Sequence, residues 1–298
     1  MAQTEHTPHF VHLEGAITVL FCLVDDAYAI LNPEGGRYES LKRLSDSEVI
    51  TLALFQQLRG IESERSFLRD AERFFSHLFP GALGIHPSSY HRRVRKLRRY
   101  LEPLRRTILV ELAGDPETLV VDSTLLAVSH PRQVPQGSGF SGAEWVRWGS
   151  FSVYGVKLHL LCATNRVPLS YELTSANVAD VPLTKELLGE AGLSEEEEEE
   201  ARRLLGDLAY RSGGLAAELA EGAIVLATEK ADRRPPIRQQ VEVCFAALKR
   251  VFGMDGTLAK TLTGLAIRIA AKVAAYTYGC YINRLLGRPQ GRIRDLWA

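Results

Sequence analysis

The amino-acid sequence predicts a mixed α/β protein that begins with an all-helical part. Apolar residues in the first 114 positions recur at helical spacing, and turn-forming residues separate the segments. After Gly114-Asp115-Pro116 the period changes, and five short strand-like runs alternate with helical segments. We therefore expect a helical N-terminal domain over residues 1–114 and a mixed α/β domain with a C-terminal helix over residues 115–298.

The N-terminal domain is predicted to consist of helices. Ser45 and Glu48 have the spacing of a capping box, which opens an apolar helix that Gly60 stops. Pro87-Ser88-Ser89 begins the longest helix of this domain. The expected helical segments cover about 15–31, 45–60, 63–78 and 90–112.

The second domain is predicted to form three strands in a meander, followed by alternating helices and strands. Thr164-Asn165 is the expected tight turn between the second and third strands. The expected strands cover 118–124, 152–163, 166–173, 204–208 and 223–228. The expected helices cover 181–191, 213–221, 237–252 and 263–286.

The charges are unevenly distributed, although 36 basic and 36 acidic residues give a net charge of zero. Residues 228–298 carry 13 basic and 5 acidic side chains, whereas residues 115–227 carry 8 basic and 17 acidic ones. A basic surface that binds nucleic acid is therefore compatible with zero net charge. The four cysteines lie far apart, and the N-terminus has no pattern of an export or membrane segment. We expect a reduced, cytoplasmic protein with no membrane partner.

Two aspartates of the second domain follow apolar strand-like runs. Asp122 follows Leu119-Val120-Val121, and Asp207 follows Leu204-Leu205-Gly206. A carboxylate beside a buried strand is costly unless it is paired or bound to a metal ion. Each aspartate taken alone is also explained as a turn or cap residue, so a third acid is needed to decide between the two interpretations.

Glu242 is the third acid, on the helix predicted over 237–252. Arg238, Glu242 and Lys249 have the spacing i, i+4 and i+11, which puts them on one narrow stripe. This stripe adjoins the apolar stripe of the helix. One interpretation is an Arg-Glu pair at the edge of the core. The other is an acid on a metal ion, with two cations on phosphate groups.

Three carboxylates that meet at one place suit metal-dependent phosphodiester chemistry. Two hard cations about 3.5–4 Å apart can activate the attacking oxygen and stabilise the leaving oxygen. Mg²⁺ prefers oxygen ligands and is usually held by few carboxylates together with substrate phosphate. The sequence has no P-loop, no serine nucleophile elbow and no His/Cys cluster. We therefore expect Asp122, Asp207 and Glu242 to be both the catalytic residues and the ligands of two Mg²⁺ ions.

The motifs occur in an order that resembles a known family. They lie at residues 21–26, 44–49, 119–123, 154–160, 176–180 and 206–210, and on the helix with Arg238, Glu242 and Lys249. Over nearly its whole length the chain resembles the DDE-type insertion-sequence transposases of bacteria, nearest to the groups numbered 982 and 4. Thirty-four residues separate Asp207 from Glu242, which is close to the spacing typical of that class.

The resemblance implies a ribonuclease-H-like domain, with a mixed five-stranded sheet of order 3-2-1-4-5, flanking helices, and Asp122 beside Asp207. It implies a transposase that cleaves DNA at insertion-sequence ends and transfers the strands with Mg²⁺ or Mn²⁺. Its partners would be double-stranded DNA, both inverted-repeat ends and target, on which we expect a homodimer in the bacterial nucleoid. Arg238 and Lys249 match family positions that contact DNA phosphates. Pro235 stands where the family pattern has a tyrosine, so that contact is not carried over.

A further DNA-binding surface is predicted on the helix over 90–112. Its first half carries Arg92, Arg93, Arg95, Lys96, Arg98 and Arg99. So many cations on one element favour contact with DNA phosphates. A solvated basic helix is the alternative interpretation.

Three other functions stay open from the sequence. A metal-dependent nuclease or resolvase on the same fold would cut DNA without joining strands. A catalytically inactive or domesticated DNA-binding protein would bind DNA without cleaving it. A phosphatase-like hydrolase would act on small phosphate esters and would not need the basic segments.

Overall fold

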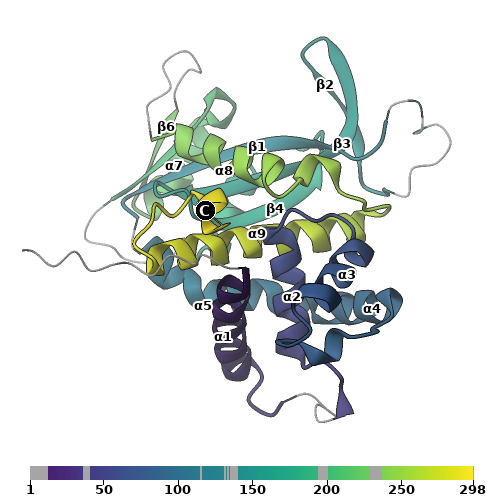
Figure 1. The fold of residues 1–298 in the computed structure, drawn as a ribbon. Coiled ribbons are helices and arrows are strands. Elements are labelled where there is room, and N and C mark those ends of the chain that lie inside the picture. The colour runs from purple at the N-terminus through teal and green to yellow at the C-terminus, as the bar shows by residue number, and fades with distance from the viewer. Residues whose placement is uncertain are drawn as a thin grey trace, which may run out of the picture. The chain divides into compact units, whose positions relative to one another are not determined.

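The computed structural model describes residues 13–35, 41–114, 116–130, 132, 134, 140–193, 201–228 and 237–297. The chain forms two compact units, each with its own core (Figure 1). The first, the helical unit, consists of Met1–Leu112, Arg250–Leu258 and Ile267–Ala298. The second, the sheet unit, consists of Ala113–Lys249 and Ala259–Ala266.

The helical unit is built around α2, nearly all of whose residues are buried. The ring of Phe55 on α2 packs against those of Phe67 and Phe75. The predicted capping box is confirmed, because Ser45 Oγ accepts a hydrogen bond from the Glu48 amide at 3.0 Å and the Glu48 carboxylate accepts one from the Ser45 amide. The helices are α1 (Leu13–Leu31), α2 (Asp46–Leu58), α3 (Glu64–Phe74), α4 (Pro87–Leu97) and α5 (Leu101–Ala113), with short 3-10 turns at Pro80–Ala82, Arg98–Tyr100, Met254–Gly256 and Ile293–Trp297.

The single long helix predicted over 90–112 is wrong. Two helices, α4 and α5, are joined by the 3-10 turn Arg98–Tyr100. Pro103 explains the break, because proline lacks an amide hydrogen and is tolerated in the first turn of a helix but not in its interior. The predicted DNA-binding cations therefore lie on α4 and the turn, before α5 begins.

The C-terminal helix α9 (Leu262–Leu285) contributes its residues from Ile267 onward to the helical unit, whereas the sequence analysis placed it in the second domain. Gly279 permits close packing, since a Cβ atom there would lie 3.0 Å from the Ile293 side chain and 3.2 Å from that of Leu58. The Tyr278 hydroxyl donates a hydrogen bond to the Leu104 carbonyl at 3.2 Å. Apolar periodicity predicts a buried helix but does not say which core buries it.

The sheet unit contains a mixed sheet of six strands, which confirms the predicted mixed α/β class. The strand order is β2-β3-β1-β5-β6, and β4 also pairs with β3. β3 is antiparallel to β1, β2 and β4, whereas β5 is parallel to β1 and β6. The strands are β1 (Thr118–Ala127), β2 (Glu144–Trp148), β3 (Phe151–Ala163), β4 (Pro168–Ser175), β5 (Arg202–Gly206) and β6 (Ile224–Thr228).

The strand β2 corrects the prediction of five strands. It forms a hairpin with the first residues of β3, from Glu144↔Gly155 to Trp148↔Phe151. The turn of the hairpin uses Gly149, whose φ of 62° is in the left-handed region that glycine adopts without strain. No strand was expected over these residues, and cross-strand contacts such as that of Trp145 with Tyr154, with ring centroids 5.4 Å apart, stabilise it as a strand.

Three helices complete the sheet unit: α6 (Leu183–Glu190), α7 (Gly213–Glu221) and α8 (Gln239–Arg250). In Figure 1, α8 runs along the sheet near β1. Two hydrogen bonds attach it there, from Lys249 Nζ to the Leu125 carbonyl at 3.2 Å and from Arg166 Nε to Gln240 Oε1 at 2.6 Å. Within the described ranges of the chain, none of the helices has both the length and the apolar character needed to span a bilayer.

Candidate active site

Asp122 and Asp207 come from two neighbouring parallel strands. Asp122 lies on β1 after the fully buried Val120 and Val121. β1 and β5 pair up to Val120↔Leu205, and the same register continued by two residues brings Asp122 beside Asp207. Such strands lie about 4.8 Å apart. Asp207 follows β5 directly, and its Oδ1 accepts a hydrogen bond from the Ala209 amide at 2.8 Å.

The environment of the Asp122 carboxyl disfavours its charged form. Burial has the largest effect and raises its pKa, which the charges of Asp207 and Glu242 raise further. The Ser123 amide, 2.8 Å from Asp122 Oδ1, and the charge of Arg238 act in the opposite direction. The resulting pKa is about 6. Both of the other predicted acids therefore lie within electrostatic reach of Asp122.

Glu242 lies in the first turn of α8 and is half-buried. It borders the buried face of α8, which is formed by Val241, Cys244, Phe245 and Leu248. The apolar stripe predicted from helical spacing thus determines which way α8 faces. Glu242 stays at the edge of this stripe, where a carboxylate is only partly desolvated.

Arg238 and Lys249, the predicted phosphate-binding residues of this helix, both lie near β1. Arg238 precedes α8, is 4% exposed, and has the charge that lowers the pKa of Asp122. Lys249 donates its hydrogen bond to the carbonyl of Leu125, three residues beyond Asp122. Pro235 lies outside the described residues.

The chemistry of the acidic side chains suits a hard divalent cation. All three donors are carboxylates, and a cation between them would offset the like charges that raise the pKa of Asp122. In the described parts of the chain, no three Asp, Glu, His or Cys side chains lie close enough together to hold a metal ion. A cation held by all three carboxylates at once would need them closer together than they lie here.

A second polar cluster surrounds Asp180 and was not predicted as part of the site. Asp180 Oδ1 lies 3.2 Å from Lys157 Nζ and 3.3 Å from Nδ1 of the fully buried His159. Asp180 directly precedes the helix expected over 181–191, but α6 begins at Leu183 with Pro182 at the cap position and no side-chain cap. The alternation of Lys157 and His159 on one side of a strand was the available signal, and it did not identify their acidic partner.

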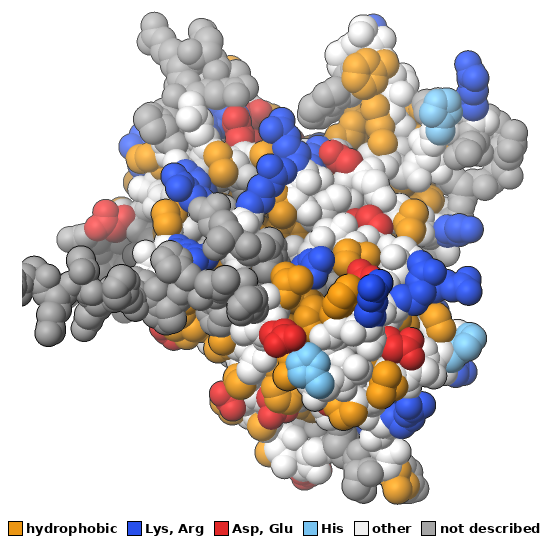
Figure 2. All heavy atoms as spheres, viewed as in Figure 1, with side chains coloured by type: hydrophobic (Ala, Val, Ile, Leu, Met, Phe, Trp, Pro, Cys, Tyr) orange, Lys and Arg blue, Asp and Glu red, His pale blue; other side chains and the backbone are white. Residues whose placement is uncertain are grey.

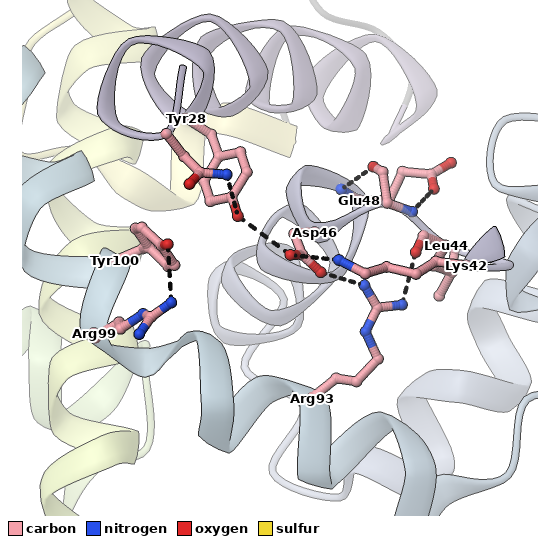
Figure 3. A network of polar contacts seen from close by, with 10 residues as sticks. Tyr28, Lys42, Leu44, Asp46, Glu48, Arg93, Arg99 and Tyr100 are labelled. Carbon is pink, nitrogen blue, oxygen red and sulfur yellow. Dashed lines mark hydrogen bonds and ion pairs between the residues drawn. The ribbon is translucent and has the colours of Figure 1, made fainter. Parts of the chain in front are cut away.

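Arg93 differs from the other cations of α4, because its guanidinium is used within the helical unit. It donates to the Leu44 carbonyl at 2.7 Å and to Asp46 Oδ1 at 2.5 Å. Lys42 Nζ lies 2.8 Å from the other oxygen of Asp46. Figure 3 shows Arg93 and Lys42 both pointing toward Asp46, with their terminal nitrogens side by side. These contacts join α4 to the start of α2.

The remaining predicted DNA-binding cations of this region are exposed. They are Arg92, Arg95, Lys96, Arg98 and Arg99. Figure 2 shows Lys and Arg side chains gathered over the part of the helical unit where α3 and α4 lie. Arg92 and Lys96 are four residues apart, so they share one face of α4.

The family model described as the transposase DDE domain matches residues 113–278, which is more than half of the chain. The matched range contains the mixed sheet and all three acids. The chain therefore belongs to the DDE transposase domain family, and the predicted resemblance to DDE-type transposases is confirmed. No curated protein sequence matches the chain.

Two solved structures show a likeness to the chain. One is the piggyBac transposase synaptic complex with hairpin DNA, at 13% identity and a TM-score of 0.42, covering 94% of this chain and 79% of that one. The other is the Mos1 mariner paired-end complex with Mn, at 11% identity and a TM-score of 0.35, covering 96% of this chain and 97% of that one.

Proposed function

We propose that this transposase cleaves DNA at the ends of an insertion sequence and joins the freed strands to target DNA, with Asp122, Asp207 and Glu242 as its catalytic acids. One observation carries the proposal. Asp207 and Glu242 are 85 and 120 residues from Asp122 in the sequence, and both raise its pKa. Perturbed carboxylates that gather from distant segments are typical of functional sites.

The three carboxylates would hold two Mg²⁺ or Mn²⁺ ions in a ribonuclease-H-like domain. Such ions lower the pKa of an attacking water molecule and stabilise charge on the leaving oxygen. The chain supplies binding and orientation. Asp122 and Asp207 approach from adjoining strands, and Glu242 approaches from α8. The Ser123 amide orients the Asp122 carboxylate through their 2.8 Å hydrogen bond.

The proposed reaction consists of two transfers at phosphorus. Water attacks the phosphodiester at the end of the element, the bond from phosphorus to the 3′ oxygen breaks, and that oxygen takes up a proton. The freed 3′-hydroxyl attacks a phosphodiester of target DNA, so that a new phosphorus–oxygen bond forms and a target 3′ end is released. Arg238 and Lys249 would contact phosphates beside the scissile bond.

The exposed cations of α4 and the following turn would bind the DNA backbone outside the acidic site. Backbone contacts of this kind provide affinity and register, and their strength falls with salt because counterions are released. Arg93 would contribute indirectly, by holding α4 against Asp46. We propose a homodimer on DNA, since an element has two ends.

The test uses the purified chain, Mg²⁺, target DNA and double-stranded DNA with the inverted repeats that flank the coding region. We expect cleavage and strand joining by the wild type and by Asp26→Asn, which changes an exposed acid on α1. Asp122→Asn should do neither. Cleavage by Asp122→Asn at the wild-type rate would remove Asp122 from the mechanism. Cleavage without strand joining would favour a nuclease or resolvase. DNA binding that does not depend on metal, with no cleavage, would favour a non-catalytic DNA-binding protein.

A further inference from the structure

The hairpin of β2 with the first residues of β3 continues past the rest of the sheet. The pairing of β3 with β1 ends at Gly155, and its pairing with β4 begins at Val156. Of the described strands, β2 alone therefore pairs with residues 151–154. Figure 1 shows this hairpin projecting from the sheet. A hairpin of two strands buries few side chains, and every residue of 144–154 whose side chain the structure describes is at least partly exposed.

One face of the hairpin, which we call the aromatic face, carries Trp145, Arg147 and Tyr154. Side chains alternate between the two faces of a strand, so Trp145 and Arg147 share a face. Tyr154 is the cross-strand partner of Trp145, and their rings lie 5.4 Å apart with 57° between their planes. The Tyr154 hydroxyl donates a hydrogen bond to the Phe140 carbonyl at 3.3 Å, which anchors the pair. Trp145 is 43% exposed and Arg147 is also exposed, so an open ring surface lies beside a cation.

The opposite face of the hairpin differs in charge. Glu144 precedes Trp145 and Phe151 is three residues from Tyr154, so both lie on the opposite face. Phe151 is 59% exposed, and Glu144 is exposed as well. A carboxylate repels phosphate groups, whereas a guanidinium attracts them. Both faces expose an aromatic ring, but the aromatic face is the one whose charge suits an anionic ligand.

The size of the aromatic face fits a nucleobase better than a protein. A fully buried aromatic side chain covers about 150–250 Å², whereas each partner of a stable protein interface loses about 800 Å² of its surface. Trp145 has less than half of its surface open. Stacking of a base needs one open ring face, and a neighbouring arginine binds the backbone beside it. The bases of a duplex are stacked on each other, so a base that stacks on Trp145 must be unpaired.

We infer that the aromatic face binds an unpaired base of the DNA substrate, with Trp145 stacked on the base, Tyr154 supporting Trp145, and Arg147 on an adjoining phosphate. The inference rests on the proposed function, which makes DNA the substrate. Asp122 pairs with Leu160 of β3, six residues from Tyr154. Six residues of a strand cover about 20 Å, which corresponds to roughly six steps along a DNA strand. The unpaired base would therefore lie roughly six nucleotides from the scissile phosphate.

Fluorescence anisotropy with labelled DNA tests the stacking. The full chain in EDTA is titrated against a duplex with the inverted-repeat end, and against the same duplex with a short run of thymine–thymine mismatches roughly six nucleotides from that end. We expect the wild type to bind the mismatched duplex about ten-fold more tightly, because its bases can stack on Trp145. Trp145→Leu should lose this preference. Trp145→Phe keeps an aromatic ring and should retain most of it.

Phe151→Leu is the matched control. It removes an exposed aromatic ring from the opposite face of the same hairpin, so it should leave the preference for mismatched DNA unchanged. Arg147→Ala should reduce the slope of log affinity against log salt by about 1, whereas Arg147→Lys should keep the slope. A preference that Trp145→Leu retains, or that Phe151→Leu loses equally, would overturn the inference, whatever the effect of either variant on Tm.

The outcomes for the wild type separate this inference from the proposed function. If the wild type binds neither DNA, the proposed function is wrong and the inference with it. If it binds both DNAs alike and cleaves the element end with Mg²⁺, the stacking role alone is wrong. Light scattering without DNA tests a second copy of the chain as the partner. A wild-type dimer that Trp145→Leu dissociates would assign the aromatic face to that contact and overturn the inference.

Discussion

Asp46 in the helical unit and Asp122 in the sheet unit are both largely removed from solvent, yet their pKa values shift in opposite directions. Burial tends to raise the pKa of Asp46, but hydrogen bonds from Lys42 and Arg93 bring it below the ordinary value. Burial raises the pKa of Asp122, and Asp207 and Glu242 add to this effect, so that it reaches about 6.

The difference separates a carboxylate that is neutralised within the fold from one that is surrounded by an excess of negative charge. Asp46 has its counter-charges within its own unit, where it links α2 to α4. Asp122 has two acids and one buried arginine, Arg238, as charged neighbours, so negative charge is in excess. Such an excess costs stability unless a cation enters, which is the condition expected of a metal-binding active site.

The largest expected effect concerns catalysis by Glu242. Glu242→Gln removes a carboxylate without changing the size of the side chain, and it should lower DNA cleavage at least ~1,000-fold because several kcal/mol of metal-assisted stabilisation are lost. Its Tm should stay close to that of the wild type. Glu218→Gln is the control, since Glu218 is an exposed acid on α7 paired with Lys185 at 3.1 Å. Wild-type cleavage by Glu242→Gln would exclude Glu242 from the site.

The next largest effect is on the free energy of unfolding, which should respond differently to substitution of Asp46 and of Asp122. Asp46→Asn weakens charge-assisted hydrogen bonds to Lys42 and Arg93 and should lower the free energy of unfolding by about 2 kcal/mol. Asp122→Asn relieves repulsion and should leave that free energy unchanged or raise it. Urea denaturation of the metal-free proteins measures both. Equal losses in the two variants would contradict the distinction between the aspartates.

The pH dependence of stability should also have opposite signs for the two residues. Because folding raises the pKa of Asp122 to about 6, its contribution to stability is present at low pH and is lost as pH rises through about 6. Wild type should therefore lose on the order of 1 kcal/mol relative to Asp122→Asn between about pH 4 and pH 7. The lowered pKa of Asp46 gives a contribution that is present at neutral pH and is lost on acidification.

Melting temperatures in EDTA, compared for wild type and the two asparagine variants at each pH, measure these contributions. EDTA is needed because a bound cation would keep Asp122 ionised. A wild-type protein that gains stability relative to Asp122→Asn as pH rises would show that the Asp122 carboxylate is stabilised by unrecognised positive charge.

The smallest effects concern DNA affinity. They distinguish Lys96, which we propose binds DNA, from Arg93 on the same helix, which pairs with Asp46. Lys96→Ala should weaken DNA binding modestly and reduce the slope of log affinity against log salt by about 1. Arg93→Ala should mainly lower Tm, because Arg93 pairs with Asp46. Binding titrations at several salt concentrations measure the slopes. A slope unchanged by Lys96→Ala would remove that residue from the proposed DNA surface.

Local patterns predicted the features that neighbouring residues determine. The capping box at Ser45, the start of β1 before Asp122 and the buried stripe of α8 all depend on residues a few positions apart. The end of α4 before α5 could also have been predicted, because Pro103 is disfavoured in the interior of a helix. β2 depends on pairing with β3, so it was not among the strands expected from local patterns.

The sequence by itself determined the mixed α/β class and the family, because a family is defined by the order and spacing of its motifs. Only the tertiary structure decided that α9 packs largely with the helical unit, that Arg93 pairs with Asp46, and that Lys157 and His159 meet at Asp180. Each of these depends on contacts between segments far apart in the chain, and their energies are set by which side chains become neighbours after folding.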